Sequence, residues 1–346
     1  MRVALLGVGL IGGSIGLAAR QRLGAHVVGW NRTPAALDTA LACGAIDEAA
    51  TSLDELAGAD IAIASVSVDA LADAVRDLCD RLPAAVVTDV GSTKQALVGA
   101  VDRMHFIGGH PLAGAESTGV AHARADLFLG ATWYLTPSQR TPGVLYERLA
   151  HFVAGLGAVP TAIGAADHDR LMAAVSHLPH VVANLLVAQV AEALGGETLP
   201  ATGPSFRDAT RVAGANPALW EQIYRANRTA LGIQIDELVD RLREVRQLLE
   251  DGDLAAWQER SARQRAALLE VARDGGPARE IRVPVPNRPG VVAQVALALG
   301  RAGINITDMS LAPEADNRTG VVALWVQPAD ARRAIELISG LGYPAA

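Results

Sequence analysis

The pattern of apolar and polar positions divides the chain into three stretches. From the N-terminus to about residue 160, short apolar runs alternate with amphipathic segments. Apolar runs bounded by turn residues predict buried strands, and their alternation with helical segments predicts a parallel, doubly wound α/β sheet with helices on both faces. The expected strands are residues 2–6, 25–30, 61–65 and 84–89.

The middle stretch, from Asp167 to about Arg273, has almost no strand-like runs. Segments 219–250 and 254–273 carry apolar residues at helical spacing, with charged residues on the opposite face. This pattern predicts an all-helical domain. Its apolar surface is large for so few helices, which favours a homodimer, with a self-contained bundle as the alternative.

A third pattern follows Asp274-Gly275-Gly276-Pro277, whose composition is typical of a linker. Strand and helix patterns then follow in the order βαββα, with a further short strand expected at the C-terminus, which predicts a ferredoxin-like α+β domain. The expected elements are residues 281–285, 290–302, 304–311, 320–326 and 329–341. We therefore expect three domains, comprising residues 1–163, 164–274 and 279–346.

Composition and charge exclude several classes of function. The net charge is −7 and only 4% of the residues are aromatic, which argues against nucleic-acid binding. Cys43 and Cys79 form neither a disulfide framework nor metal-ligand spacing, so we expect a reduced, cytoplasmic location and no metal site. Polar residues interrupt the apolar run 181–194, and we expect no membrane-spanning segment.

A glycine-rich motif connects the first predicted strand to a helix. The sequence Gly7-Val8-Gly9-Leu10-Ile11-Gly12 matches the dinucleotide-binding fingerprint in the context that this fingerprint requires. The first glycine permits a tight turn, the second lets the backbone approach a pyrophosphate, and the third lets helix and strand pack closely. The motif therefore predicts a bound nicotinamide dinucleotide, with its phosphates at the helix N-terminus.

The end of the second predicted strand bears on which dinucleotide binds. An NAD-binding unit usually places Asp or Glu there for the ribose hydroxyls, but this chain has Asn31-Arg32-Thr33. A cation and a hydroxyl at this place favour the 2′-phosphate of NADP over NAD. The alternative is that Arg32 stacks on the adenine, as it could with either cofactor.

Four further motifs concentrate polar residues, and one of them holds Lys94, the only lysine in the chain. The motifs are Gly91-Ser92-Thr93-Lys94, Gly109-His110-Pro111-Leu112-Ala113-Gly114-Ala115-Glu116, Ser176-His177-Leu178-Pro179-His180 and Phe206-Arg207-Asp208-Ala209-Thr210-Arg211. Their order over residues 1 to about 270 resembles the prephenate dehydrogenase family of tyrosine biosynthesis. The later segments Asn287-Arg288-Pro289-Gly290 and Gly303-Ile304-Asn305-Ile306 resemble an ACT domain, an amino-acid-sensing module.

The resemblance implies an oxidative decarboxylation of prephenate to 4-hydroxyphenylpyruvate with hydride transfer to the nicotinamide. This reaction needs a base for the substrate hydroxyl, and the imidazole of His110 suits neutral pH. Ser92 would orient that ring. The planar guanidinium of Arg211 suits bidentate binding of a substrate carboxylate.

The resemblance also places His177 and His180 in the substrate pocket, with His177 as the more direct ligand, although both could be ordinary buried or surface histidines. Glu116 would lie at the mouth of that pocket, with a solvated position as the alternative. The backbone of Ser65 and Val66 could line the nicotinamide.

Lys94 and three residues of the ACT-like segment carry predictions about charge and regulation. Lys94 could balance the cofactor phosphate charge or stabilise the turn that it follows. In the ACT-like segment, Asn287, Gly290 and Asn305 are candidates for binding an amino-acid effector such as tyrosine, and a purely structural role is the alternative.

Three other functions compete with this interpretation. An arogenate dehydrogenase would use the same chemistry on an amino rather than a keto side chain. A non-catalytic sensor of NAD(P) and an amino acid would not need His110 as a base. A β-hydroxyacid dehydrogenase needs a lysine in its second domain, and no lysine follows Lys94.

Overall fold

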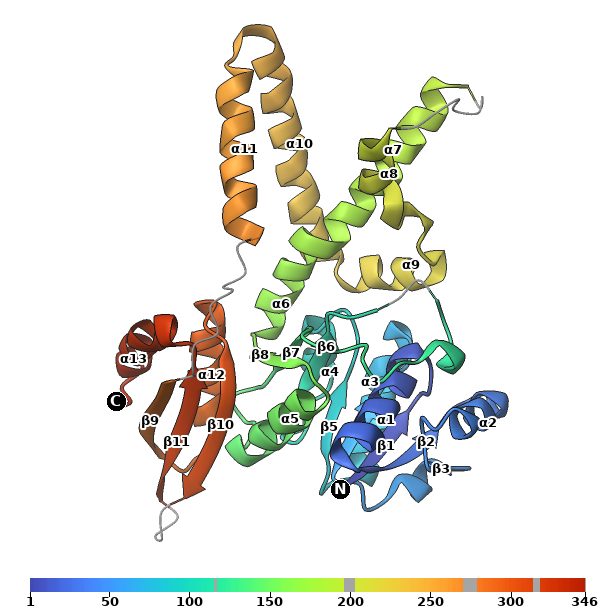
Figure 1. The fold of residues 1–346 in the computed structure, drawn as a ribbon, viewed down its shortest axis with the longest axis vertical. Helices are drawn as coiled ribbons and strands as arrows, with labels where there is room; N and C mark the ends of the chain where they lie inside the picture. Colours follow the sequence, from blue (N-terminus) through green and yellow to red (C-terminus); the bar gives the residue numbers. More distant parts are fainter. Residues whose placement is uncertain (115–116, 196–202, 270–278, 314–317, 346) are drawn as a thin grey trace. The chain divides into compact units, whose positions relative to one another are not determined.

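The computed structural model describes residues 1–114, 117–195, 203–269, 279–313 and 318–345 (Figure 1). The chain forms two compact units. The first comprises residues 1–169, 217–226 and 278–346, and the second comprises residues 170–216 and 227–277. The three domain boundaries predicted from the sequence remain a prediction.

A five-stranded parallel sheet forms the base of the first unit, with strand order β3-β2-β1-β4-β5. Its strands are β1 (Arg2–Leu6), β2 (His26–Trp30), β3 (Glu48–Ala49), β4 (Ile61–Ala64) and β5 (Val86–Asp89). Every residue of β4 and β5 is buried, as expected for strands covered on both faces. The predicted parallel sheet is confirmed.

Helices α1 (Leu10–Leu23), α2 (Pro34–Ala42), α3 (Val68–Arg81) and α4 (Gln95–Ala100) accompany this sheet. In α3 the buried side chains recur at helical spacing, at Leu71, Ala74, Val75, Leu78 and Cys79. The strand order reverses between β1 and β4, so their carboxyl ends flank the crevice where this class of sheet binds ligands.

A second sheet departs from the predicted topology. It contains β6 (Gly108–Pro111), β7 (Thr132–Thr136) and β8 (Val159–Ala162), and α5 (Gly143–Gly155) connects the last two. β6 and β7 pair antiparallel, so the expectation of parallel strands to about residue 160 was wrong here. In the described part of residues 112–131 the only helix is the 3₁₀ turn Val120–His122, whereas a parallel return needs a longer crossover, usually an α-helix.

The C-terminal part of the first unit is an antiparallel sheet with two helices, as predicted. Its elements are β9 (Arg279–Pro286), α12 (Val291–Arg301), β10 (Ile306–Pro313), β11 (Thr319–Val326) and α13 (Ala331–Gly340). The strand order is β10-β11-β9. Alternate residues Ile281, Val283 and Val285 are buried, as in a sheet with one covered face. The expected final strand is absent from the described residues 341–345.

Every element that the structure describes between residues 165 and 269 is helical, which confirms the predicted all-helical middle region. They are α6 (Ala165–Met172), the π-helical segment Ala173–His177, α7 (Leu178–Ala193), α8 (Pro204–Thr210), the 3₁₀ turn Arg211–Gly214, α9 (Pro217–Ala226), α10 (Arg228–Asp251) and α11 (Leu254–Leu269). The predicted long segment 219–250 is two helices, because the chain leaves helical geometry at Asn227.

One continuous helical stretch, Ala165–Ala193, is long and apolar enough to cross a membrane by length and composition alone. Several of its large apolar side chains are exposed, and Leu185 is 62% exposed. A helix that packs against a second copy of the chain would have the same profile.

Candidate functional site

The glycine-rich loop between β1 and α1 has the geometry that the fingerprint predicts. Gly7 has φ +97°, and a Cβ there would lie 2.3 Å from the Ser65 carbonyl oxygen. A Cβ on Gly12 would lie 2.2 Å from the Gly7 carbonyl oxygen. Around Gly9, by contrast, no other described atom comes within 4 Å of a Cβ position. The loop therefore leaves open the one place where a pyrophosphate would approach the N-terminus of α1, and these residues fit a dinucleotide.

Asn31 connects the end of β2 to this loop. Its Oδ1 accepts a hydrogen bond from the Val8 amide at 3.1 Å, and its Nδ2 donates to the Thr33 carbonyl at 3.1 Å. Arg32 and Thr33 are exposed beside it, at the start of α2. Asn31 thus shapes the loop through its side chain, and Arg32 is accessible to a ligand.

Ser65 and Val66 follow β4 directly and are half-buried. The Ser65 amide donates to the Leu6 carbonyl at 2.7 Å, which fixes this turn beside the glycine-rich loop. The structure therefore brings the predicted cofactor residues of the β1, β2 and β4 ends together within the first unit.

His110 lies in β6 and is the first member of a buried hydrogen-bonded chain. Its Nδ1 is 2.9 Å from Nε2 of His168, and Nδ1 of His168 is 2.8 Å from Oδ1 of Asp169. His110 is 9% exposed, His168 is 0% exposed and Asp169 is 2% exposed. Neither His168 nor Asp169 was predicted from the sequence.

Asp169 is held as an acceptor by a helix N-terminus. Its two carboxylate oxygens accept hydrogen bonds from the amides of Lys94 and Gln95, at 2.8 and 2.9 Å, where α4 begins. Oδ1 of Asp169 also accepts a hydrogen bond from Nδ1–H of His168.

The neutral state of His168 sets the direction of its hydrogen bond with His110. Burial lowers the pKa of His168, so this ring is neutral and its Nε2 carries a lone pair. That lone pair accepts a hydrogen bond from Nδ1–H of His110. The proton of neutral His110 is thereby kept on Nδ1, and Nε2 is left as the basic nitrogen.

Lys94 is fully buried and forms an ion pair with Asp89 at the end of β5. Asp89 also accepts hydrogen bonds from the amides of Gly91 at 2.8 Å and Gly109 at 3.0 Å. Burial lowers the pKa of Lys94, and the charge of Asp89 opposes that shift. This geometry favours the role of stabilising the turn over that of contacting cofactor phosphate.

The roles predicted for Ser92 and Glu116 remain predictions. Ser92 is half-buried, and the partner of His110 Nδ1 is His168. Orientation of the ring by Ser92 therefore remains a prediction. Glu116 lies outside the residues that the structure describes.

In the second unit, His177 is buried at the end of the π-helical segment. Its Nδ1 is 3.1 Å from Nδ2 of Asn227, the residue that separates α9 from α10. Asn227 is itself 4% exposed. The interruption of the predicted long helix thus places an amide against this imidazole, a contact that local sequence patterns did not reveal.

His180 and Arg211 form the accessible part of the second unit's polar site. His180 is half-buried, and Arg211 is exposed at the start of the 3₁₀ turn Arg211–Gly214. Burial lowers the pKa of His180, and the positive charge of Arg211 lowers it further. The structure therefore brings these two predicted substrate residues together, with a neutral imidazole beside a permanent cation.

Comparisons with known proteins agree with these features. Residues 15–161 match the profile of the prephenate dehydrogenase nucleotide-binding domain, and residues 164–260 match that of the prephenate dehydrogenase dimerization domain. The prephenate dehydrogenase of Bacillus subtilis is 31% identical over 96% of this chain and 94% of its own length. The chain belongs to the prephenate dehydrogenase family. It is therefore an NAD(P)-dependent oxidoreductase, and the predicted family and enzyme class are confirmed.

Solved structures of this prephenate dehydrogenase family have the same fold. A prephenate dehydrogenase from A. aeolicus, in complex with hydroxyphenyl propionate and NAD+, is 27% identical, covers 78% of this chain and 98% of its own, and gives a TM-score of 0.71. The arogenate dehydrogenase of Synechocystis is 28% identical, covers 78% of this chain and all of its own (100%), and gives a TM-score of 0.68.

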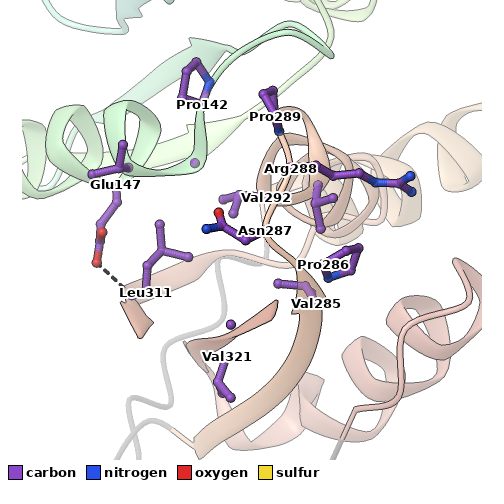
Figure 2. Close-up of a pocket in the computed structure, with 14 residues that line it drawn as sticks. Pro142, Glu147, Val285, Pro286, Asn287, Arg288, Pro289, Val292, Leu311 and Val321 are labelled. Carbon is purple, nitrogen blue, oxygen red and sulfur yellow. Dashed lines mark hydrogen bonds between the residues drawn. The ribbon is translucent and has the colours of Figure 1, made fainter. Parts of the chain in front are cut away.

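Beyond the two prephenate dehydrogenase profiles, the C-terminal part of the chain contributes a cavity of about 380 Å³. Its walls come from the β9–α12 loop, from β10 and β11, and from the start of α5 (Figure 2). Figure 2 shows the Asn287 amide directed toward Leu311, whereas the Arg288 guanidinium points away. Glu147 Oε1 accepts a hydrogen bond from the Leu311 amide at 2.9 Å. The cavity thus combines apolar walls with an amide and a carboxylate.

The other two predicted regulatory residues contact the rest of the first unit. The Gly290 amide donates to the Thr141 carbonyl at 3.1 Å. Thr161 Oγ1 donates to Asn305 Oδ1 at 3.5 Å. Of the three candidates, only Asn287 lines the cavity.

Proposed function

We propose that this chain is a prephenate dehydrogenase that converts prephenate to 4-hydroxyphenylpyruvate and CO2. Its membership of the prephenate dehydrogenase family is the strongest support. The observation that carries the mechanism is the buried chain His110–His168–Asp169. It supplies an imidazole whose basic nitrogen is defined before the substrate arrives.

In this proposal Nε2 of His110 takes the proton of the substrate hydroxyl. The carbon that bears the hydroxyl becomes a carbonyl carbon as its hydride leaves for the nicotinamide that the glycine-rich loop would hold. The bond to the ring carboxylate then breaks, and its electron pair makes the ring aromatic as CO2 departs. General-base catalysis of this type contributes about 10²- to 10⁴-fold in rate.

Arg211 is the proposed ligand of a substrate carboxylate. Its exposed guanidinium can form two parallel hydrogen bonds to a carboxylate, and the neutral ring of His180 beside it can donate a further one. His177 remains a proposed substrate residue. Its hydrogen bond to Asn227 shows what positions the ring.

For the cofactor, we propose NADP as the preferred dinucleotide, with NAD as the alternative. Arg32 is exposed beside the glycine-rich loop, and the end of β2 has no carboxylate to repel a 2′-phosphate. The A. aeolicus relative was solved with NAD+. The variant R32A should therefore raise the KM for NADP+ more than the KM for NAD+ if NADP is preferred, and should affect both equally if Arg32 stacks on adenine.

The test is the initial rate of nicotinamide reduction, with prephenate and arogenate each supplied with NAD+ and NADP+. We expect turnover of prephenate. Turnover of arogenate alone would instead assign the activity of the Synechocystis neighbour. Binding of cofactor with no turnover of either substrate would favour the non-catalytic sensor.

We also propose that the chain forms a homodimer through its helical region. A dimerization-domain profile matches residues 164–260, and exposed apolar residues on α7 include Leu185, Leu186 and Val187. Sedimentation equilibrium should give twice the chain mass. The variant L185E should shift the chain toward the monomer.

Finally, we propose that an amino-acid effector such as tyrosine binds the cavity beside Asn287. The apolar walls suit its side chain, and Glu147 and Asn287 suit its ammonium and carboxylate groups. An effector in this cavity should lower kcat, whereas tyrosine competing at the active site should raise the KM for prephenate. N287A in the full chain should remove only the kcat effect; a purely competitive pattern in both proteins would contradict the proposal.

A further inference from the structure

Helix α12 extends from the cavity to the helix that carries His168. Val291 and Val292, its first residues, line the cavity. Arg301, its last residue, donates from Nε to Oδ2 of Asp167 at 3.0 Å, in the first turn of α6. A single helix of the C-terminal part of the first unit thus reaches both places.

Glycines fix both ends of α12 against backbone atoms of the N-terminal part of the unit. A Cβ on Gly300 would lie 1.9 Å from the carbonyl oxygen of Ala162, the last residue of β8. Gly290, just before the helix, has φ +88°, and a Cβ there would lie 2.1 Å from the Gln139 carbonyl oxygen. Because neither glycine has a side chain, the two ends of α12 pack directly against the backbone of Ala162 and Gln139.

Only five residues separate Ala162 from His168. The amide of His168 donates to the Gly164 carbonyl at 2.8 Å, which closes the first turn of α6. A Cβ on Gly164 would lie 3.0 Å from Oδ2 of Asp167, the atom that Arg301 contacts. The end of α12 therefore packs on the turn that sets the position of His168, and His168 holds Nδ1 of His110.

We propose that α12 is a positioning element for the catalytic imidazole: through Gly300 on Ala162 and Arg301 on Asp167, it sets the place of His168 and hence the orientation of His110. This inference rests on the proposed role of His110 as the base. It gives the cavity a physical route to the reaction, because a ligand beside Val291 and Val292 displaces the same helix. The expected consequence is a change in kcat at constant KM for prephenate.

The test uses the full chain with two changes at the end of α12 and a matched control for each. G300A inserts a methyl group against Ala162, and G340A inserts one at the end of α13, where no described atom lies within 4 Å. R301Q removes the ion pair to Asp167, and R282Q removes an ion pair within β9 to Glu280 at 2.8 Å. R301K keeps the charge and is the conservative variant.

We expect G300A to lower kcat at least tenfold. R301Q should lower it about two- to fivefold, because Arg301 is 64% exposed and exposed ion pairs are weak. R301K should recover most of that loss. The KM for prephenate should not change in any variant, R301Q should keep the wild-type Tm, and both control variants should keep the wild-type kcat.

The inference would be overturned if R301Q and G300A kept the wild-type kcat, or if R301Q lost no more activity than R282Q. If G300A fails to fold, the comparison of R301Q, R301K and R282Q still tests whether α12 positions the catalytic imidazole. The variant H110N, measured in parallel, distinguishes a failure of the role of α12 from a failure of the role of His110 as the base. If H110N is inactive while R301Q and G300A keep the wild-type kcat, only the role of α12 is contradicted. If H110N is active, the role of His110 as the base is contradicted as well.

Discussion

The polar site of the first unit and the polar site of the second unit differ in their exposure to solvent. In the first unit, His110, His168 and Asp169 are all at least nine-tenths buried, and each makes a directed hydrogen bond. In the second unit, Arg211 is exposed and His180 is half-buried, and His177 alone of the three proposed substrate residues there is buried. A group that accepts a proton benefits from a fixed tautomer and a dry environment, whereas a group that captures a charged substrate must stay accessible. The difference between the sites thus follows the difference between their proposed tasks.

The largest effect should come from replacing Lys94, which lies among the buried polar residues of the first unit. K94M leaves the buried carboxylate of Asp89 without its cation and should lower the free energy of unfolding by about 3–5 kcal/mol. The control is R76Q, which breaks an exposed ion pair to Asp73 and should cost at most about 1 kcal/mol. Urea unfolding measures both. Equal losses would show that burial does not distinguish these pairs.

On the accessible side, R211A should raise the KM for prephenate about 10- to 150-fold, because hydrogen bonds to charged groups contribute about 1.5–3 kcal/mol. R211K should recover only part of the loss, since an ammonium cannot form the bidentate pair. R207A, which changes an exposed arginine of the neighbouring helix α8, is the matched control and should keep the wild-type KM. Steady-state kinetics give these values, and a lower kcat at constant KM in R211A would contradict the assignment.

H168N should act in the opposite way, on kcat and not on KM. Removing the acceptor of His110 Nδ1–H frees the ring to rotate and to change tautomer, and we expect a loss of about 10- to 100-fold, by analogy with the residues that orient metal-binding histidines. H26N changes an exposed histidine of β2 and should leave kcat unchanged. A wild-type kcat in H168N would show that the buried chain does not support catalysis.

The smallest effect concerns stability against pH. Burial lowers the pKa of His168 in the folded chain, so below the unfolded value of about 6.5 the unfolded state binds the extra proton. The contribution of His168 is therefore intact above that pH and is lost as the pH falls toward the folded pKa. The free energy of unfolding should fall more steeply with acidification in the wild type than in H168N; parallel curves would contradict this sign.

Local sequence patterns were sufficient to predict the elements that depend only on residues close together in the sequence. The glycine-rich loop and the strands β1, β2, β4 and β5 follow from apolar runs and glycine spacing, and the structure has them at or within two residues of the predicted places. The antiparallel return of β7 depends on the length and content of a connection, which the alternation of strands and helices does not encode.

The missed site residues act through contacts that are distant in sequence. His168 and Asp169 read as the polar start of an amphipathic helix, yet Asp169 binds the start of α4, 74 and 75 residues earlier. Asn227 continues a helical pattern, and its contact with His177 spans 50 residues. The available signal was an adjacent His-Asp pair at the start of the predicted helical region, which is too common to have been decisive alone.

The most direct test of the account is the H110N variant with prephenate and its preferred cofactor. The asparagine cannot accept the hydroxyl proton at neutral pH, so kcat should fall by about 10²- to 10⁴-fold. Calorimetric titration of the same preparation should still give wild-type affinity for the dinucleotide, because the glycine-rich loop is untouched. An unchanged kcat with intact cofactor binding would contradict the role of His110, and with it the function assigned to the buried chain behind it.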